Sequence, residues 1–185
     1  MSAFSLSKAL CSLLLAPLGL IAWSSAQAAT TYYVRTDGGT ASQCTGRANA
    51  PYPGSGSAQA CAWNHPSVAL PASGSPRIAG GDTLLIGGGS YSIGSSLQAV
   101  PSGASTARTR ILGNAGTPPR LIGKNGISHI LSLKGSSHVE VGNLEITDGS
   151  DCVYAHSVSS VACTSATPWA RGGIYASASR NVWLH

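Results

Sequence analysis

Five basic residues in the middle of the chain are the first candidates for binding chemistry. They are Arg108, Arg110, Arg120, Lys124 and Lys134. If they lie on successive turns of a repeating structure, their side chains form a ladder that attracts a polymer bearing carboxylates. A solvated basic face accounts for the same residues without any ligand. The candidate substrate-binding residues among these five are Arg108, Arg110 and Lys134.

An acidic cluster follows these basic residues. Glu145, Asp148 and Asp151 supply the oxygen atoms that Ca²⁺ prefers as ligands. The cluster lacks the D-x-D-x-D-G spacing of a calcium loop, and aspartate is common in turns for conformational reasons. The turn interpretation is therefore favoured, with Asp148 and Asp151 kept as the candidate metal ligands.

Aromatic side chains offer a second kind of contact, because their rings can stack on a sugar ring. Trp169, in the loop PWARGG, is the candidate for that role, whereas Trp63 and Trp183 are expected to pack in the core or at a corner. Four histidines show no H-x-x-x-H spacing, and each is expected to be structural or exposed: His129, His138, His156 and His185. The chain contains no G-x-S-x-G and no H-E-x-x-H motif.

The first 28 residues show the pattern of a secretory signal peptide. Lys8 supplies a positive charge, residues 9–23 form an apolar stretch too short to span a bilayer comfortably, and Ala26-Gln27-Ala28 is a small-x-small cleavage site. We expect cleavage after Ala28 and a secreted or periplasmic product. No later stretch has the length and apolarity of a membrane span.

Cysteine usage agrees with export. Beyond the signal peptide the chain keeps Cys44, Cys61, Cys152 and Cys163. An even number in an exported chain implies disulfides, and four cysteines allow three pairings. The absence of a C-x-x-C spacing disfavours zinc or thioredoxin-type chemistry. We expect Cys44 to pair with Cys61 and Cys152 with Cys163, because each pair closes a loop of low apolar content.

Composition sets the fold class. The chain has 185 residues, enough for one domain over residues 29–185, with 23 glycines, 9% charged residues, one Phe and one Met. Such a chain favours short strands joined by turns over long amphipathic helices. The formal net charge of +5 is explained by a solvated surface or by attraction to an acidic polymer. We expect no nucleic-acid partner.

The elements that must position these residues are short. Alternating apolar residues predict strands at 31–35, 83–86, 90–93, 109–112, 120–123 and 144–147. The loop from 36 to 59 should be pinned by Cys44 and Cys61, and the run Gly87-Gly88-Gly89 should form a tight corner. Pro66, preceded by Asn64 and His65, predicts a short helix that caps the N-terminal end of the domain.

Two stretches near the end of the chain repeat one another. When Val139 is aligned with Val182, Leu131 meets Ile174 and Val141 meets Leu184. Each stretch reads as part of one coil, and such coils must stack to bury their inner faces. The spacing between the two copies is about twice the length of one coil of 20–30 residues. We therefore expect the extra residues between them to form a loop that leaves the stack of coils. The expected core of these coils is Leu131, Leu133, Val139, Val141, Leu144, Ile146, Val182 and Leu184.

Several segments together resemble the right-handed parallel β-helix proteins of the pectate-lyase-like superfamily. They are TYYVRTDGG at 31–39, GGDTLLIGGGSY at 80–91, SGASTARTRILGNAGTPPRLIG at 102–123, SSHVEVGNLEITDG at 136–149 and GGIYASASRNVWLH at 172–185. The resemblance covers residues 31–185 and implies an all-β right-handed parallel β-helix solenoid with a short N-terminal cap. The expected domain is C-terminally incomplete, because the sequence stops within a coil.

The resemblance also implies a class of activity. Its lyases use a Lys or Arg base on one long face of the solenoid, often beside Ca²⁺ held by Asp or Glu, so Ca²⁺ is the cofactor that it implies. No catalytic residue carries over by motif. We therefore expect an exported protein acting on polysaccharide, in the first place a lyase of acidic polymers whose catalytic coils are absent here. The alternative is a non-catalytic surface or carbohydrate-binding β-helix protein.

Overall fold

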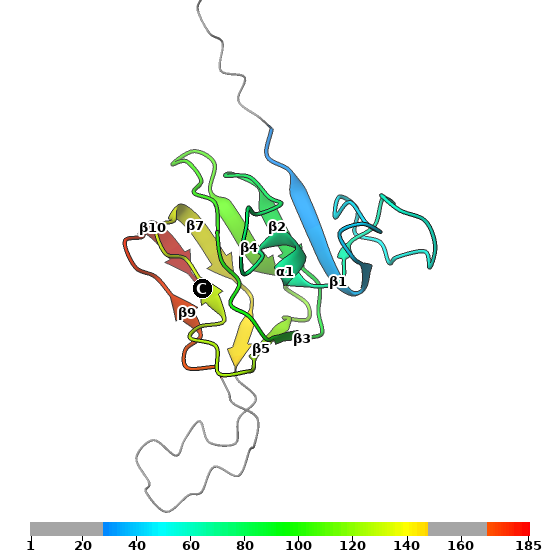
Figure 1. Cartoon of the computed structure of the whole chain (residues 1–185). Coiled ribbons are helices and arrows are strands. Elements are labelled where there is room, and N and C mark those ends of the chain that lie inside the picture. The colour runs from blue at the N-terminus through cyan, green and yellow to red at the C-terminus, as the bar shows by residue number, and fades with distance from the viewer. Residues whose placement is uncertain (1–27, 148–169) are drawn as a thin grey trace, which may run out of the picture.

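The computed structural model describes residues 28–147 and 170–185, and these residues form an all-β structure (Figure 1). Every strand pair is parallel. The largest sheet has the order β1 (Thr31–Gly39), β2 (Thr83–Ile86), β4 (Thr109–Gly113), β7 (Ser137–Gly142) and β10 (Arg180–Leu184). Within the described part of the chain no helix is long and apolar enough to cross a membrane.

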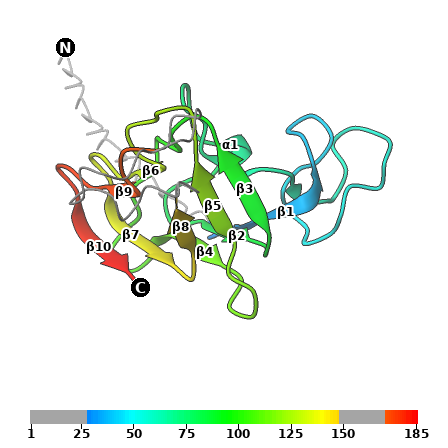
Figure 2. The same ribbon diagram turned by 90° about the horizontal axis from the view of Figure 1, so that it is seen from below.

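Two smaller sheets complete the architecture. One contains β3 (Ser90–Ile93), β5 (Arg120–Gly123) and β8 (Glu145–Thr147), and the other contains β6 (Leu131–Ser132) and β9 (Ile174–Tyr175). Leu97 joins the last sheet through a bridge to Leu131. From β2 onward the chain therefore passes through the three sheets in the same order, and each new strand pairs with the preceding strand of its own sheet (Figures 1 and 2).

The core lies between these sheets. Strand residues alternate between buried and accessible positions, as in β2, where Leu84 and Ile86 are buried. The parallel register places Leu84 beside Ile111, so apolar side chains stack from strand to strand. Full burial of a Leu or Ile side chain contributes about 1.5–3 kcal/mol, which makes these stacks the main source of stability.

Most of the expected core residues are confirmed. Leu131, Leu133, Val139 and Val141 are buried, and three others are partly buried against the core: Leu144, Ile146 and Val182. The prediction for Leu184 is wrong, because its side chain is 54% exposed. Its register partner Val141 faces the interior, so Leu184 shares that face, but no described strand lies on the other side of β10 to cover it.

The short helix forms where the sequence predicts it. α1 (Pro66–Ala69) has Pro at its first position, and the His65 side chain caps it by accepting a hydrogen bond from the Ser67 backbone N–H. The Leu70 N–H closes the helix by donating to the Pro66 carbonyl. Ala69 and Leu70 are fully buried, which places the helix on the core.

Strand β1 is longer than expected. The glycine- and polar-rich sequence from Thr36 onward predicts a loop, yet the strand continues to Gly39. The reason is long-range pairing: the Gly39 N–H donates to the Ala62 carbonyl and the Asn64 N–H donates to the Gly39 carbonyl. The segment after Cys61 therefore extends the strand by pairing with it, which local composition does not reveal.

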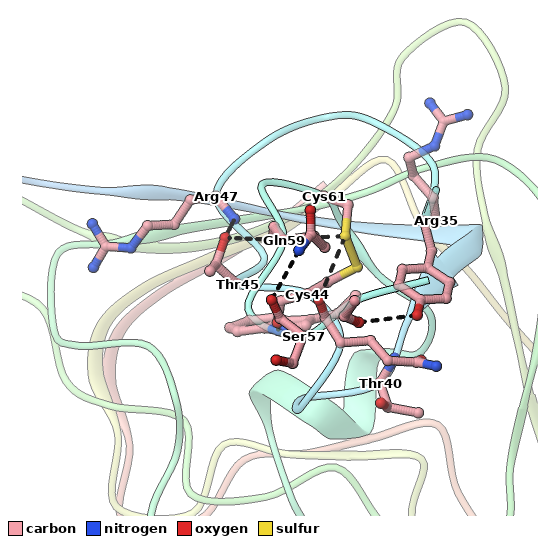
Figure 3. The surroundings of a disulfide bond; sticks show 12 residues. Arg35, Thr40, Cys44, Thr45, Arg47, Ser57, Gln59 and Cys61 are labelled. Atoms are coloured by element: carbon pink, nitrogen blue, oxygen red, sulfur yellow. Dashed lines mark hydrogen bonds between the residues drawn. A yellow bond between two sulfur atoms is a disulfide. The ribbon is translucent and has the colours of Figure 1, made fainter. Parts of the chain in front are cut away.

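A disulfide joins Cys44 to Cys61 and closes the loop beside β1, confirming this half of the predicted pairing (Figure 3). The Trp63 indole N–H donates to the Cys44 carbonyl at 2.9 Å, and the Trp63 ring stacks on Tyr32 with centroids 5.1 Å apart. Trp63 is buried, as predicted. The loop is thus held covalently at its ends and by aromatic packing beneath it. The Cys152–Cys163 pair lies outside the described residues.

Candidate functional site

The outer face of the five-stranded sheet gathers most of the candidate chemistry. Because parallel pairs place like faces together, accessible side chains form rows across the sheet. One row crosses all five strands through Thr31, Thr83, Arg110, Glu140 and Trp183. A neighbouring row contains Tyr33, Leu85, Leu112 and Gly142. The face therefore carries an apolar strip beside a polar and charged one.

A charged group lies within the first row. The Arg110 Nε atom is 3.0 Å from Glu140 Oε2, and the His185 Nε2 atom is 3.2 Å from Glu140 Oε1. The Glu140 side chain is only 14% exposed, whereas Arg110 and His185 are exposed. The Glu140 carboxylate thus lies between a nitrogen atom of Arg110 and a nitrogen atom of His185. The positive charge of Arg110 is paired with this carboxylate.

Arg108 behaves differently from Arg110. Its guanidinium lies over the Trp183 ring, 3.6 Å from the ring centroid, and it donates a hydrogen bond to the Asn181 carbonyl. The prediction of a packed Trp183 is wrong, since this side chain is 56% exposed. Trp183 occupies an accessible position of β10, because the inward positions of that strand belong to Val182 and Leu184. Arg108 and Trp183 together form an exposed cationic and aromatic platform.

The remaining basic candidates lie elsewhere. Arg120 is on the three-stranded sheet, where its Nε atom is 2.9 Å from Glu145 Oε1. Lys124 directly follows β5, Lys134 lies in the turn between β6 and β7, and both are exposed. The structure therefore brings Arg108 and Arg110 to one face of the five-stranded sheet but distributes the other three basic residues over other sheets and corners.

Every described carboxylate is engaged within the chain. Asp37, Glu140 and Glu145 form ion pairs with arginines. Asp82 is buried and accepts hydrogen bonds from the backbone N–H groups of Thr30 and Ala79. Across residues 28–147 and 170–185 no three His, Cys, Asp or Glu side chains group closely enough to hold a metal ion. The candidates Asp148, Asp151 and Trp169 lie outside the described residues.

A cavity of about 390 Å³ opens at the other end of the sheet, near the ends of β1 and β2. Its lining includes Tyr33, Arg35, Asp37, Asn49, Asn114 and Thr117. Tyr33 belongs to the apolar row of the outer face, so the cavity continues that face toward the disulfide-closed loop. Residues from β1, from this loop and from the corner after β4 therefore converge on one hollow.

The polar wall of the cavity is a two-point ion pair. Arg35 donates from Nε to Asp37 Oδ1 at 2.7 Å and from Nη2 to Asp37 Oδ2 at 2.9 Å, and its Nη1 donates to Asn49 Oδ1 at 3.2 Å. The hydrogen bond from Arg35 lowers the pKa of Asp37, and the same bond raises the pKa of Arg35. Both groups are therefore ionised, and their charges compensate each other.

Sequence reasoning missed this wall. Arg35 and Asp37 are two positions apart on a strand, a spacing that places both side chains on one face. This spacing is visible in the sequence, but the composition after Thr36 predicts a loop at residue 37. Asn49 comes from the loop closed by the disulfide, and nothing in its local sequence indicates contact with β1.

The comparisons with known proteins returned no match: no family model, no curated protein and no solved structure is similar to this chain.

Proposed function

We propose that the chain is an exported right-handed parallel β-helix protein that binds an acidic polysaccharide on the outer face of its five-stranded sheet. The repeated passage through three parallel sheets supports the solenoid, and right-handed crossovers are the rule for parallel strands. The predicted signal peptide and the Cys44–Cys61 disulfide support a secreted or periplasmic location.

The observation that carries this proposal is the Arg108–Trp183 platform. The guanidinium covers one face of the indole and supplies a positive charge for a carboxylate, and the exposed remainder of the ring offers an apolar surface for a sugar. Stacking on the ring holds the guanidinium in place, so less side-chain entropy is lost when a ligand binds.

Charge balance favours an acidic ligand over a neutral one at this platform. The described carboxylates are all engaged inside the chain, whereas Arg108 has no carboxylate partner among the described residues. The formal net charge of the sequence is +5. A polymer that carries regularly spaced carboxylates would be attracted by the surplus positive charge, and the attraction would weaken as salt increases.

The shape of the face suits a chain-like ligand. Five neighbouring strands separated by about 4.8 Å span roughly 19 Å from β1 to β10. The row through Arg110 crosses all five strands, and the row through Leu85 runs from β1 to β7, where the His185 ring lies on Gly142. A linear oligosaccharide can lie along such a face and contact the Arg108–Trp183 platform with one of its residues.

The resemblance implies lyase activity in the first place, and turnover is therefore one outcome of the test. The contacts of the described residues support binding, and they assign no side chain the role of a base. We therefore propose binding of the acidic polysaccharide, and its cleavage is measured in the same samples.

Affinity electrophoresis in gels containing polygalacturonate or alginate tests the proposal. The wild-type chain should be retarded, and Arg108→Ala and Trp183→Ala should each lose most of the retardation. Lys124→Ala is the matched control, because it removes the same charge from a corner between two other sheets. Equal migration of wild type and Arg108→Ala would contradict the proposal. Unsaturated product formed in the presence of Ca²⁺ would instead establish the lyase.

A further inference from the structure

We propose that the cavity beside Arg35 and Asp37 is a separate binding site for an uncharged pyranose residue. It lies at the β1 end of the five-stranded sheet, whereas the Arg108–Trp183 platform lies on β10 at the opposite end (Figure 1). Its volume of about 390 Å³ falls within the range of small-molecule sites, about 300–1,000 Å³. The inference uses neither Arg108 nor Trp183, the two residues of the proposed acidic-polymer platform.

The charge in the cavity wall selects against an anion. Asp37 engages the Arg35 guanidinium at two points, so the pair presents no net charge to a ligand. A carboxylate placed here would meet the Asp37 carboxylate, which is more than half exposed, before it found a free positive charge. An uncharged ligand avoids this repulsion.

The remaining hydrogen-bonding groups match sugar hydroxyls, each of which donates and accepts. Arg35 has five N–H donors and uses three of them on Asp37 and Asn49. Asp37 keeps unused lone pairs on both oxygens, and Asn49, which accepts through Oδ1, keeps its amide donors. The wall therefore offers both donors and acceptors, which can pair with neighbouring hydroxyls of a sugar ring.

An apolar floor lies beside this polar wall. Tyr33 and Leu85 are register partners on the outer face, and both line the cavity. A pyranose has a flat face of C–H groups that packs against such a surface while its hydroxyls reach the wall. This division into an apolar floor and a polar rim is general for small-molecule sites.

The walls are fixed before any ligand arrives. The disulfide (Figure 3) flanks the loop that carries Asn49. The Tyr52 N–H donates to the Asp37 carbonyl at 2.9 Å. A Cβ atom on Gly88 would lie 2.8 Å from Thr117 Cγ2, so only glycine lets the corner after β4 approach β2 this closely. Rigid walls reduce the entropy lost on binding.

Side-chain amide signals in a ¹H–¹⁵N spectrum test the site, because Asn49 and Asn114 both line it. Cellobiose and maltose serve as neutral probes and digalacturonate as the acidic one. At least one neutral disaccharide should shift both amide pairs at millimolar concentration, with digalacturonate at least several-fold weaker. Absence of any shift with both neutral probes, or a stronger response to digalacturonate, would overturn the inference.

Two variants and two control variants sharpen this test. Asp37→Asn leaves the Arg35 charge uncompensated, so the preference should reverse toward digalacturonate. Thr117→Trp should fill the cavity and abolish the neutral shifts, whereas Thr106→Trp, in an exposed turn before β4, should leave them unchanged. Arg108→Ala should also leave them unchanged, so failure of the acidic-polymer proposal is distinguished from failure of this one. An unaltered response in Thr117→Trp would contradict the assignment to this cavity.

Discussion

Leu131 of β6 lies directly opposite Ile174 of β9 in a parallel pair, in the register that aligning the two stretches of sequence predicts. The same alignment sets Val139 opposite Val182 and Val141 opposite Leu184, and the structure shows both pairs. A repeat in the sequence therefore becomes a repeat in space, because equivalent residues occupy equivalent positions on neighbouring strands.

This stacking predicts unequal costs for equivalent substitutions. Leu131 is fully buried between Leu97 on one side and Ile174 on the other, whereas Ile174 is only partly buried. Leu131→Ala should lower the free energy of unfolding by about 2–5 kcal/mol, and Ile174→Ala should cost clearly less. Urea unfolding of both variants checks this. An equal or larger loss for Ile174→Ala would argue against a ladder that continues through Leu97.

The disulfide should be essential to the loop beside β1. Cys44 and Cys61 are 17 residues apart, and closing a loop of this size contributes about 3 kcal/mol in the chain-entropy model. The double variant Cys44→Ala/Cys61→Ala should lose a comparable free energy of unfolding. Peptide mapping without reduction should recover the Cys44–Cys61 pair, and Cys44 linked to Cys152 or Cys163 would refute it.

His65 should make the stability depend on pH. Burial lowers its pKa below the ordinary 6.5, although the Ser92 carbonyl acts in the opposite direction. The neutral ring accepts from the Ser67 N–H at Nδ1 and faces the Ser92 carbonyl through Nε2, 3.2 Å away. Protonation would remove the Nδ1 acceptor and with it the helix cap.

The sign of this effect follows from linkage. The unfolded chain binds the proton more readily, so the contribution of His65 is complete above pH 6.5 and is lost as the pH falls toward the lower folded-state pKa. His65→Asn keeps a capping side chain that does not titrate. Between about pH 7.5 and pH 5 the wild type should lose more stability than this variant in denaturant unfolding. Identical pH profiles would show that His65 carries no such linkage.

Much of the fold was predictable because its signals are local. Alternating residues predicted the bounds of β2, β3 and β5, and Pro66 with its polar predecessor predicted α1. The extension of β1 to Gly39 was not predictable in this way, since it depends on pairing with residues after Cys61. The exposure of Leu184 likewise depends on what lies next to β10, not on the strand's own pattern.

The candidate site was less predictable, because its contacts join distant parts of the chain. Arg108 was singled out for its charge, but its position on Trp183 requires the register of β4, β7 and β10. The pairing of Arg110 with Glu140 removes from the basic group a charge that composition alone counts as free. Asn49 reaches Arg35 only through the closed loop. The residue types indicate which contacts are chemically possible, and the register of the strands decides which side chains meet.

The indole N–H signals of the tryptophans test the central claim most directly. Trp183 is exposed beneath Arg108, whereas the Trp63 N–H is buried on the Cys44 carbonyl and serves as an internal reference. Titration with oligogalacturonate should shift the Trp183 signal, assigned by its loss in Trp183→Phe, and leave the Trp63 signal in place. Added salt and Arg108→Ala should both reduce the shift. A Trp183 signal that stays unchanged at saturating oligogalacturonate would contradict acidic-polysaccharide binding at this platform.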